Sequence, residues 1–171
     1  ASTHSYVLFF TDRGRCYWLK VHEIPEGSRQ AKGKAIVNLV TLSRDEKVTA
    51  LVPVREFDES HFLILVTRKG TIKKTKLSEY SNVRTTGIKA IKIDQGDELI
   101  EVAVTSGNND IVIATKHGLS IRLHESDVRE MGRDTTGEKG NELSNEDRVV
   151  GVVGIKRDAT LLCFTEKGLG K

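Results

Sequence analysis

Residues 61–76 read His-Phe-Leu-Ile-Leu-Val-Thr-Arg-Lys-Gly-Thr-Ile-Lys-Lys-Thr-Lys and carry the signal of a β-hairpin. The apolar run 61–67 is rich in β-branched residues and too short for a helix, and it is followed by the turn sequence Lys69-Gly70. Beyond the turn, Ile72 and small residues stand among lysines, which is typical of a strand with one packed face and one wet face. The stretch therefore predicts two antiparallel strands joined by a tight turn.

The same turn signal, Thr-x-x-Gly, recurs along the chain. Its copies are Thr11-Asp12-Arg13-Gly14, Thr67-Arg68-Lys69-Gly70, Thr115-Lys116-His117-Gly118 and Thr165-Glu166-Lys167-Gly168. The spacing of roughly 50 residues is a period typical of propellers, solenoids and arrays. Glycine supplies the positive φ that a tight hairpin requires, so we assign the turn glycines to structure.

One repeated unit of about four strands explains this pattern. The predicted units cover approximately residues 6–54, 61–105 and 110–155, with the start of a further unit at 160–171, all in a single domain over 1–171. After the hairpin, each unit has a polar stretch with an arginine and a glycine, and then a third strand, expected at 35–39 in the first unit and at 88–93 in the second. The predicted fold class is all-β, with propeller-like blades.

The composition of the 171-residue chain favours a soluble, globular protein. No apolar run approaches the ~20 residues needed to span a bilayer. The first residues, Ala-Ser-Thr-His-Ser-Tyr, lack the charged and apolar regions of a signal peptide, so the expected compartment is the cytoplasm. Cys16 and Cys163 lie in apolar runs without metal-like spacing, and we expect both to be reduced packing residues.

The placement of charge is more informative than the net charge of +3. Basic residues follow the turn glycines and gather again in the polar loop of each unit, whereas acidic residues cluster at 56–59, 94–98 and 142–147. If the units stack in the same orientation, the basic segments form a stripe along one rim, which suits a polyanion bound along its phosphate backbone. The competing explanation is that these side chains keep wet strand faces soluble and protect strand edges.

Patterns for catalysis or metal binding are absent from the sequence. The five histidines form no His-x-x-x-His pair, and there is neither a glycine-rich phosphate loop nor a Gly-x-Ser-x-Gly elbow. Carboxylate pairs such as Asp45-Glu46 and Asp97-Glu98 stand in predicted turns, where such residues serve turn chemistry. We therefore expect no catalytic residue, no metal and no cofactor in this chain.

Two parts of the sequence resemble a known protein family. The first is residues 7–26, Val-Leu-Phe-Phe-Thr-Asp-Arg-Gly-Arg-Cys-Tyr-Trp-Leu-Lys-Val-His-Glu-Ile-Pro-Glu, with 28–33 and 36–39 after it; the second is 127–137, Asp-Val-Arg-Glu-Met-Gly-Arg-Asp-Thr-Thr-Gly. They resemble the C-terminal domain of the A subunit of bacterial DNA gyrase, and the resemblance extends over essentially the whole chain. It implies a β-pinwheel, a propeller-like disc whose neighbouring blades exchange strands and whose basic rim bends DNA.

The resemblance also implies a function, namely DNA binding and wrapping without sequence specificity, in support of ATP-dependent negative supercoiling by the gyrase holoenzyme. The implied partners are double-stranded DNA, the rest of the gyrase A polypeptide, and the gyrase B polypeptide, which binds ATP. The family's cleavage tyrosine follows an arginine, whereas Tyr6, Tyr17 and Tyr80 do not, so the chain itself is expected to be no enzyme.

Phosphate contacts are the role that the resemblance gives to basic residues of the outer strands and polar loops. The corresponding residues here are Arg29, Lys32, Lys34, Lys73, Lys74, Lys76, Arg84, Lys89, Arg122, Arg129, Arg133 and Lys139. Contacts of this kind position DNA without reading bases, and any sequence preference comes from how easily the duplex bends.

The family also carries a Gln-Arg-Arg-Gly-Gly-Lys-Gly heptapeptide needed for wrapping. The nearest stretch in this chain is Gln30-Ala31-Lys32-Gly33-Lys34, which lacks the paired arginines. We expect the chain to be a fragment of a larger polypeptide, with open strand edges through which two copies could associate.

Two alternatives remain open. The C-terminal domain of the topoisomerase IV A subunit shares the repeat, and a propeller-like scaffold could instead bind protein at its rim. DNA binding predicts that log affinity falls by about 0.9 per neutralised phosphate against log salt. A protein-binding rim predicts weak salt dependence and an apolar patch among the charges. Tyr17 and Trp18 fit either function, since both can also simply pack beneath the neighbouring blade.

Overall fold

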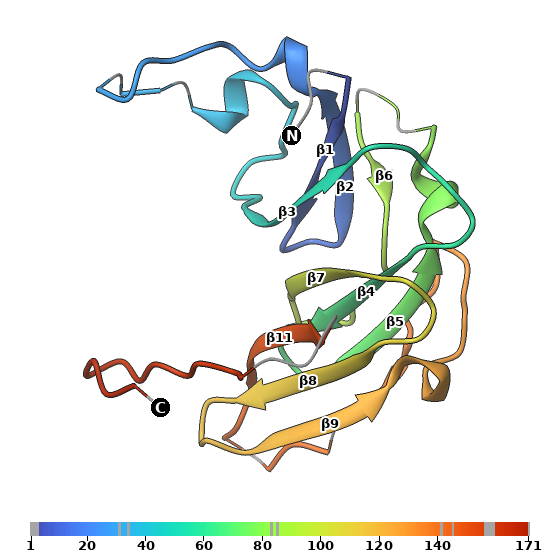
Figure 1. Cartoon of the computed structure of the whole chain (residues 1–171), viewed down its shortest axis with the longest axis vertical. Helices are drawn as coiled ribbons and strands as arrows, with labels where there is room; N and C mark the ends of the chain where they lie inside the picture. The colour runs from blue at the N-terminus through green and yellow to red at the C-terminus, as the bar shows by residue number, and fades with distance from the viewer. Residues whose placement is uncertain are drawn as a thin grey trace.

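The computed structural model describes residues 4–30, 32–33, 35–82, 84, 86–140, 142–144, 146–155 and 160–170. Within these ranges the chain forms eleven β-strands and four short 3-10 helices. The strands make three antiparallel sheets that stand side by side in a crescent (Figure 1). The prediction of an all-β, propeller-like repeat is confirmed. None of the helices in the described ranges is long and apolar enough to cross a membrane.

The first sheet has the strand order β3-β1-β2-β6. Its hairpin joins β1 (Tyr6–Thr11) to β2 (Arg15–Lys20), and β3 (Val48–Val54) pairs with the free edge of β1. The fourth strand, β6 (Ile88–Lys89), comes from the second unit and pairs with β2. The first sheet is therefore completed by a strand from the next unit along the chain.

The second sheet repeats this arrangement with the order β10-β5-β4-β7. Its own strands are β4 (Phe62–Thr67), β5 (Thr71–Lys76) and β7 (Leu99–Thr105). The two-residue strand β10 (Glu138–Lys139) reaches it from the third unit and pairs with β5. The second and third units thus each send a short strand back to the sheet before them, which is the strand exchange of a β-pinwheel.

The third sheet, of order β11-β8-β9, has three strands within the described residues. They are β8 (Asp110–Thr115), β9 (Ser120–His124) and β11 (Val149–Ile155). A 3-10 turn follows the second strand of each unit, as η1 (Val21–Glu23), η3 (Leu77–Tyr80) and η4 (Glu125–Asp127).

The predicted third strands differ from the observed ones in two units. In the second unit β6 ends at Lys89, because the N–H groups of Ala90 and Ile91 both donate to the carbonyl of Gly14 and the ladder stops there. In the first unit, residues 35–39 are not a strand but contain the 3-10 helix η2 (Ile36–Asn38). The exchanged strands β6 and β10 each need the outer strand of a preceding sheet, and the described residues contain no sheet before the first.

The Thr-x-x-Gly turns have one geometry in all four copies. The glycine φ angles are 73°, 88°, 84° and 79°, and each glycine N–H donates to the threonine carbonyl at 2.9–3.1 Å. The threonine hydroxyl accepts the N–H of the residue after the glycine at 3.1–3.3 Å. The structural role predicted for the glycines is confirmed, and the hydroxyl bond supplies a physical reason for the threonine.

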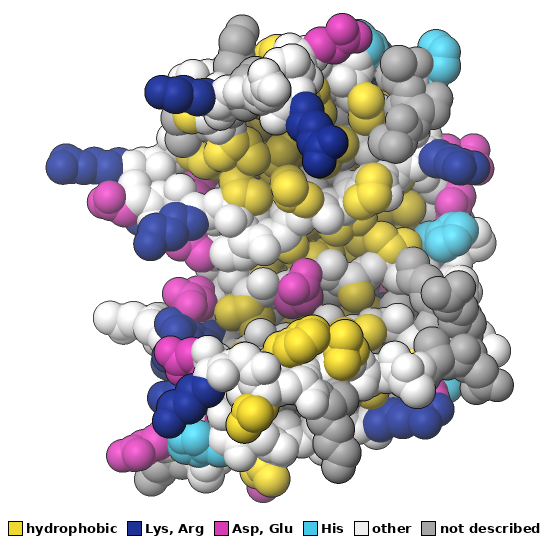
Figure 2. All heavy atoms as spheres, turned by 60° about the vertical axis from the view of Figure 1, so that its left-hand side comes forward, with side chains coloured by type: hydrophobic (Ala, Val, Ile, Leu, Met, Phe, Trp, Pro, Cys, Tyr) yellow, Lys and Arg dark blue, Asp and Glu magenta, His cyan; other side chains and the backbone are white. Residues whose placement is uncertain are grey.

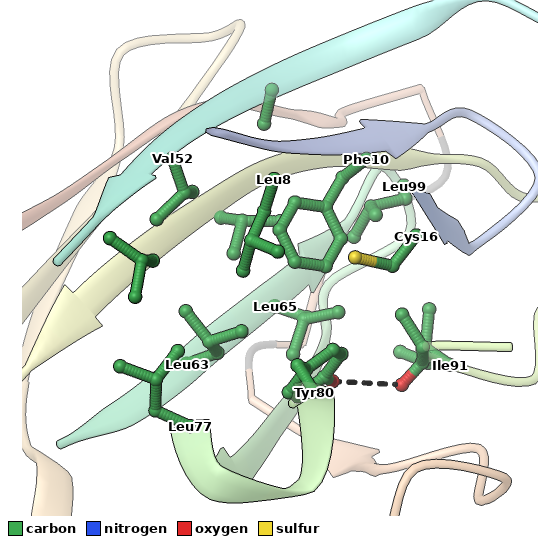
Figure 3. Packing of buried hydrophobic residues seen from close by; sticks show 14 residues of the cluster. Leu8, Phe10, Cys16, Val52, Leu63, Leu65, Leu77, Tyr80, Ile91 and Leu99 are labelled. Atoms are coloured by element: carbon green, nitrogen blue, oxygen red, sulfur yellow. Dashed lines mark hydrogen bonds between the residues drawn. The ribbon is translucent and has the colours of Figure 1, made fainter. Parts of the chain in front are cut away.

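Two apolar clusters hold the three sheets together. Along β4, Leu63 and Leu65 face the first cluster, between the first and second sheets, whereas Ile64 and Val66 face the second cluster, between the second and third sheets. Figure 3 shows the first cluster, with the Tyr80 hydroxyl directed at the carbonyl of Ala90, 3.5 Å away. Full burial of each such side chain contributes about 1.5–3 kcal/mol, so the central sheet is stabilised on both faces.

The strands β3, β7 and β11 lie on the concave side of the crescent, and β7 contacts both of the others (Figure 1). Leu51 on β3 and Val150 and Val153 on β11 leave apolar surface exposed. Figure 2 shows apolar side chains gathered over the middle of this side, with lysines and arginines mostly at its margins. The outer strands of the sheets, β6, β10 and β9, form the opposite edge.

Residues 160–170 form the fourth Thr-x-x-Gly turn, closed by a bridge between Phe164 and Gly170. Leu162 and Phe164 are exposed here, because this stretch packs against no sheet of the described residues. Cys163 is exposed as well, so its predicted role as a packing residue is wrong. Cys16, on β2, is fully buried as predicted.

Candidate nucleic-acid interface

The outer edge of the crescent carries two crossing segments, residues 86–98 of the second unit and 128–140 of the third. Each contributes its exchanged strand, β6 or β10, to the preceding sheet. A Cβ on Gly87 would lie 2.6 Å from the Tyr17 ring, and one on Gly137 would lie 2.6 Å from the carbonyl oxygen of Ile72. Glycine at these positions lets the segments lie directly on the sheet, and Tyr17 packs beneath the second unit.

A cleft of about 490 Å³ opens between the crossing segments, and we call it the rim cleft. Arg84 and Lys89 of the second unit and Arg133 of the third line it, together with Glu79 and Asp134. Three of the residues predicted to contact phosphate thus come together, although they belong to different units.

Positive charge exceeds negative charge in the rim cleft. Lys89 Nζ lies 3.4 Å from Asp134 Oδ1, and Arg133 Nε lies 3.8 Å from Glu79 Oε2. Arg84 is exposed and has no ion-pair partner within the described ranges. Solvent-exposed ion pairs contribute about 0–1 kcal/mol, so a phosphate group can compete with the two carboxylates. The rim cleft can accept a phosphate group.

Lys73 is not on the exposed rim, contrary to our expectation. Its side chain is fully buried, and Nζ donates to the carbonyl of Ala90 at 2.7 Å and to the carbonyl of Arg133. The prediction of a wet face on β5 fails because the third unit covers this strand; the N–H of Met131 donates to the carbonyl of Lys74 at 2.8 Å. Burial lowers the pKa of Lys73 to about 8, because it removes the charged ammonium group from water.

Lys74 and Lys76, also on β5, make ion pairs within the protein. Lys74 is buried, with Nζ 3.7 Å from Glu125 Oε2 and 4.5 Å from the centre of the Phe62 ring. The half-buried Lys76 places its ammonium group 3.6 Å from a carboxylate oxygen of both Glu59 and Glu130. The exposure expected for Lys74 is therefore wrong, and Lys76 is only partly accessible.

The third unit contributes exposed basic residues that lie outside the rim cleft. Arg122, on β9, donates from Nε to Asp110 at 2.7 Å, and Arg129 donates from Nε to Glu138 at 3.2 Å. Both side chains remain more than half exposed. They can extend a basic track along the edge, but the structure does not bring them to the same cleft as Arg84.

Lys139 lines a second cleft, of about 480 Å³, near the hairpin turn of the second sheet. Arg68, Lys69 and Arg148 line the same cleft, and the residues predicted from the sequence include none of them. The sequence does contain a signal for Lys69, because the third position of the Thr-x-x-Gly turn is basic or histidine in each copy. These residues are Arg13, Lys69, His117 and Lys167.

In the first unit, the residues predicted to contact phosphate precede η2 in the sequence. Arg29 and Lys32 are exposed there. Lys34 lies outside the described residues. Their position in the unit corresponds to that of Arg84 in the second unit, where the polar loop precedes the exchanged strand.

Other kinds of site find little support in the described parts of the chain. No group of three or more His, Cys, Asp or Glu side chains there could hold a metal ion. Burial raises the pKa of the Cys16 thiol far above its usual value, which makes it a poor nucleophile.

Comparison with known proteins identifies relatives over the whole chain. The gyrase A subunits of Salmonella typhimurium and Escherichia coli are 43% and 44% identical over all 171 residues, and that of Helicobacter pylori is 44% identical over 173 aligned positions. The chain spans about a fifth of the length of these relatives.

Solved structures show the same architecture. The C-terminal domain of a DNA topoisomerase IV matches 99% of the chain with a TM-score of 0.87 and 29% identity, and the chain covers 53% of that domain. A DNA gyrase A C-terminal domain matches 99% with a TM-score of 0.83 and 23% identity, and 54% of it is covered. The family model described as "DNA gyrase C-terminal domain, beta-propeller" matches residues 5–55, 61–106 and 109–156. Because these matches follow the three units and cover most of the sequence, the chain belongs to the family of DNA gyrase C-terminal domains.

Proposed function

We propose that this chain binds double-stranded DNA without reading its sequence and bends it along the outer edge of the crescent, as part of a DNA gyrase A polypeptide. The observation that carries the proposal is the rim cleft, where Arg84, Lys89 and Arg133 converge from two units of a gyrase C-terminal domain. These groups suit the phosphate backbone, which any sequence presents.

The basic track that we propose is centred on the rim cleft. Lys139 extends it on the neighbouring cleft, Arg122 and Arg129 extend it across the third unit, and the first unit adds three more residues. These are Arg29, Lys32 and Lys34. We assign the three lysines of β5 to contacts within the protein instead.

In the parent enzyme, a type II topoisomerase, such a bend would present DNA to the cleavage site with a fixed handedness and so support ATP-dependent negative supercoiling. The partners in this proposal are the rest of the gyrase A polypeptide and the gyrase B polypeptide, and the compartment is the cytoplasm. We assign the cleavage tyrosine and ATP binding to other parts of the holoenzyme, and no cofactor to this chain.

Sequence identity supports gyrase over topoisomerase IV as the parent. The gyrase A subunits that align with the whole chain are 42–44% identical to it, and the family model that matches its three units is that of DNA gyrase C-terminal domains. The larger TM-score of the topoisomerase IV domain supports only a shared fold.

Fluorescence anisotropy with a labelled duplex of about 40 base pairs, measured across a range of salt, tests the DNA-binding proposal. We expect a steep fall of log affinity with log salt, and a slope smaller by about 0.9 for each phosphate contact removed in an Arg84→Ala, Lys89→Ala, Arg133→Ala variant. Arg44→Ala is the matched control, because Arg44 is 97% exposed and does not line the rim cleft. Circular dichroism checks that each variant is folded.

Two results would overturn the proposal. One is the absence of binding at low salt, which would favour a rim that binds protein. The other is a triple variant that binds with the same affinity and slope as the Arg44 control.

A further inference from the structure

We propose that Lys73 is a positioning residue for the rim cleft: it touches no DNA, but its buried ammonium group fixes the backbone from which Arg133 reaches the phosphate. This inference rests on the proposed function. Lys73 lies on β5, the strand that pairs with the exchanged strand β10, and is 0% exposed. The role therefore differs from that of the charged residues on the track.

The contacts of Lys73 join two units. Its Nζ donates at 2.7 Å to the carbonyl of Ala90, in the crossing segment of the second unit, and also to the carbonyl of Arg133, in that of the third. One ammonium group thus fixes the spacing of the two segments that form the walls of the rim cleft. Between them, the N–H of Lys92 donates to the carbonyl of Thr135 at 2.9 Å, next to this junction.

The backbone of Arg133 is held from both sides. Lys73 binds its carbonyl, and its N–H donates to Glu79 Oε2 at 3.3 Å. The side chain itself is about one-third exposed, and within the described residues its ion pair is the 3.8 Å contact with the same carboxylate. The anchored backbone and the loosely held guanidinium group suit a residue that must be available at a fixed place for an incoming phosphate.

A buried lysine carries an energetic cost that a packing role alone does not require. Burial lowers the pKa of Lys73 to about 8, with the carboxylates of Glu79 and Asp134 acting against this shift and Arg133 adding to it. An apolar side chain of the same length would fill the space without desolvating a charge, but it could not hold two carbonyl groups. The amine therefore fits the need for a fixed cleft geometry.

A double-mutant cycle between Lys73→Met and Arg133→Ala tests the inference, with the salt slope of duplex binding as the readout. In the native background we expect Arg133→Ala to reduce the slope by about 0.9, as for one phosphate contact. In the Lys73→Met background its effect should be less than half of that, because the guanidinium group is already misplaced. Arg122→Ala, on β9 and away from Lys73, should have the same effect in both backgrounds.

Hydrogen exchange without DNA gives an independent readout. We expect faster exchange in residues 131–135 of folded Lys73→Met, with unchanged exchange in the hairpin of the third sheet. If Lys73→Met does not fold, Lys73→Leu, which likewise has no side-chain N–H donor for the two carbonyl groups, takes its place in both measurements.

The outcomes separate the two proposals. Native protein that fails to bind DNA refutes the proposed function and this inference with it. If the native protein binds DNA and Arg133→Ala reduces the salt slope equally in the native and Lys73→Met backgrounds, only the positioning role is refuted. Unchanged exchange at 131–135 in the Lys73 variant refutes it as well.

Discussion

Lys74→Met tests whether a buried ion pair holds the third unit to the second. Lys74 Nζ lies 3.7 Å from Glu125 Oε2 and donates to the Glu125 carbonyl at 3.1 Å, while the Glu125 side chain is fully buried. Methionine keeps the volume but leaves the carboxylate without its counter-charge. Removing one partner of a buried pair costs about 3–5 kcal/mol. The Thr105 hydroxyl and the Asn109 N–H still bind this carboxylate, so we expect the lower end, about 3 kcal/mol.

Urea unfolding followed by circular dichroism gives the free energy of unfolding for each variant. Lys76→Met is the matched control, because Lys76 lies on the same strand and pairs with two partly exposed carboxylates at 3.6 Å, for which we expect a loss of about 0–1 kcal/mol. The Lys74→Met, Glu125→Gln double variant should lose less than the sum of the single losses, because it leaves no unpaired charge. Equal losses for Lys74→Met and Lys76→Met, or strictly additive single losses, would refute the reasoning.

Three further predictions concern other parts of the molecule. The pKa of Lys73 falls from 10.5 to about 8 on folding, so the unfolded chain binds more protons than the folded chain between these pH values. The free energy of unfolding should therefore rise by about 3 kcal/mol across that window, relative to Lys73→Met. Parallel pH profiles of the two proteins in urea unfolding would contradict this. Gly87→Ala should cost at least about 2 kcal/mol, because φ is +74° and the new Cβ would lie 2.6 Å from the Tyr17 ring, and an unchanged melting temperature would exclude that clash. A thiol reagent should modify the exposed Cys163 at once and the buried Cys16 only after unfolding; fast modification that survives Cys163→Ser would show that Cys16 is accessible.

Much of the fold could be predicted from the sequence because the hairpin has strong local signals. The Thr-x-x-Gly turn and the runs beside it locate β4 and β5 to within one residue. The exchanged strands could not be placed in the same way. β6 and β10 are two residues long, too short for any alternation, and a repeat does not reveal whether a strand joins its own sheet or the one before it. The strand expected at 35–39 is wrong for this reason.

The candidate site could be predicted where its residues stand in loops. Arg84 and Arg133 belong to polar stretches that the structure places on the outer edge. The exposure expected for Lys73 and Lys74 is wrong, because the expectation of a wet face assumes that a strand has only one packed side. The alternation rule does not account for a crossing segment that arrives from another unit, and that segment buries both lysines.

If the proposed function holds, strand exchange determines where phosphate sites occur along the rim. The walls of the rim cleft come from the second and third units, but the strand that carries Lys89 is held by β2 of the first, where Arg15 also donates to the carbonyl of Thr86. Three consecutive units are therefore needed for one complete cleft. Basic residues repeat once per unit in the sequence, whereas the sites that they build repeat once per junction between units. The contacts to DNA should follow the spacing of the junctions, and a change at a buried junction such as Lys73 should weaken binding without removing any exposed charge.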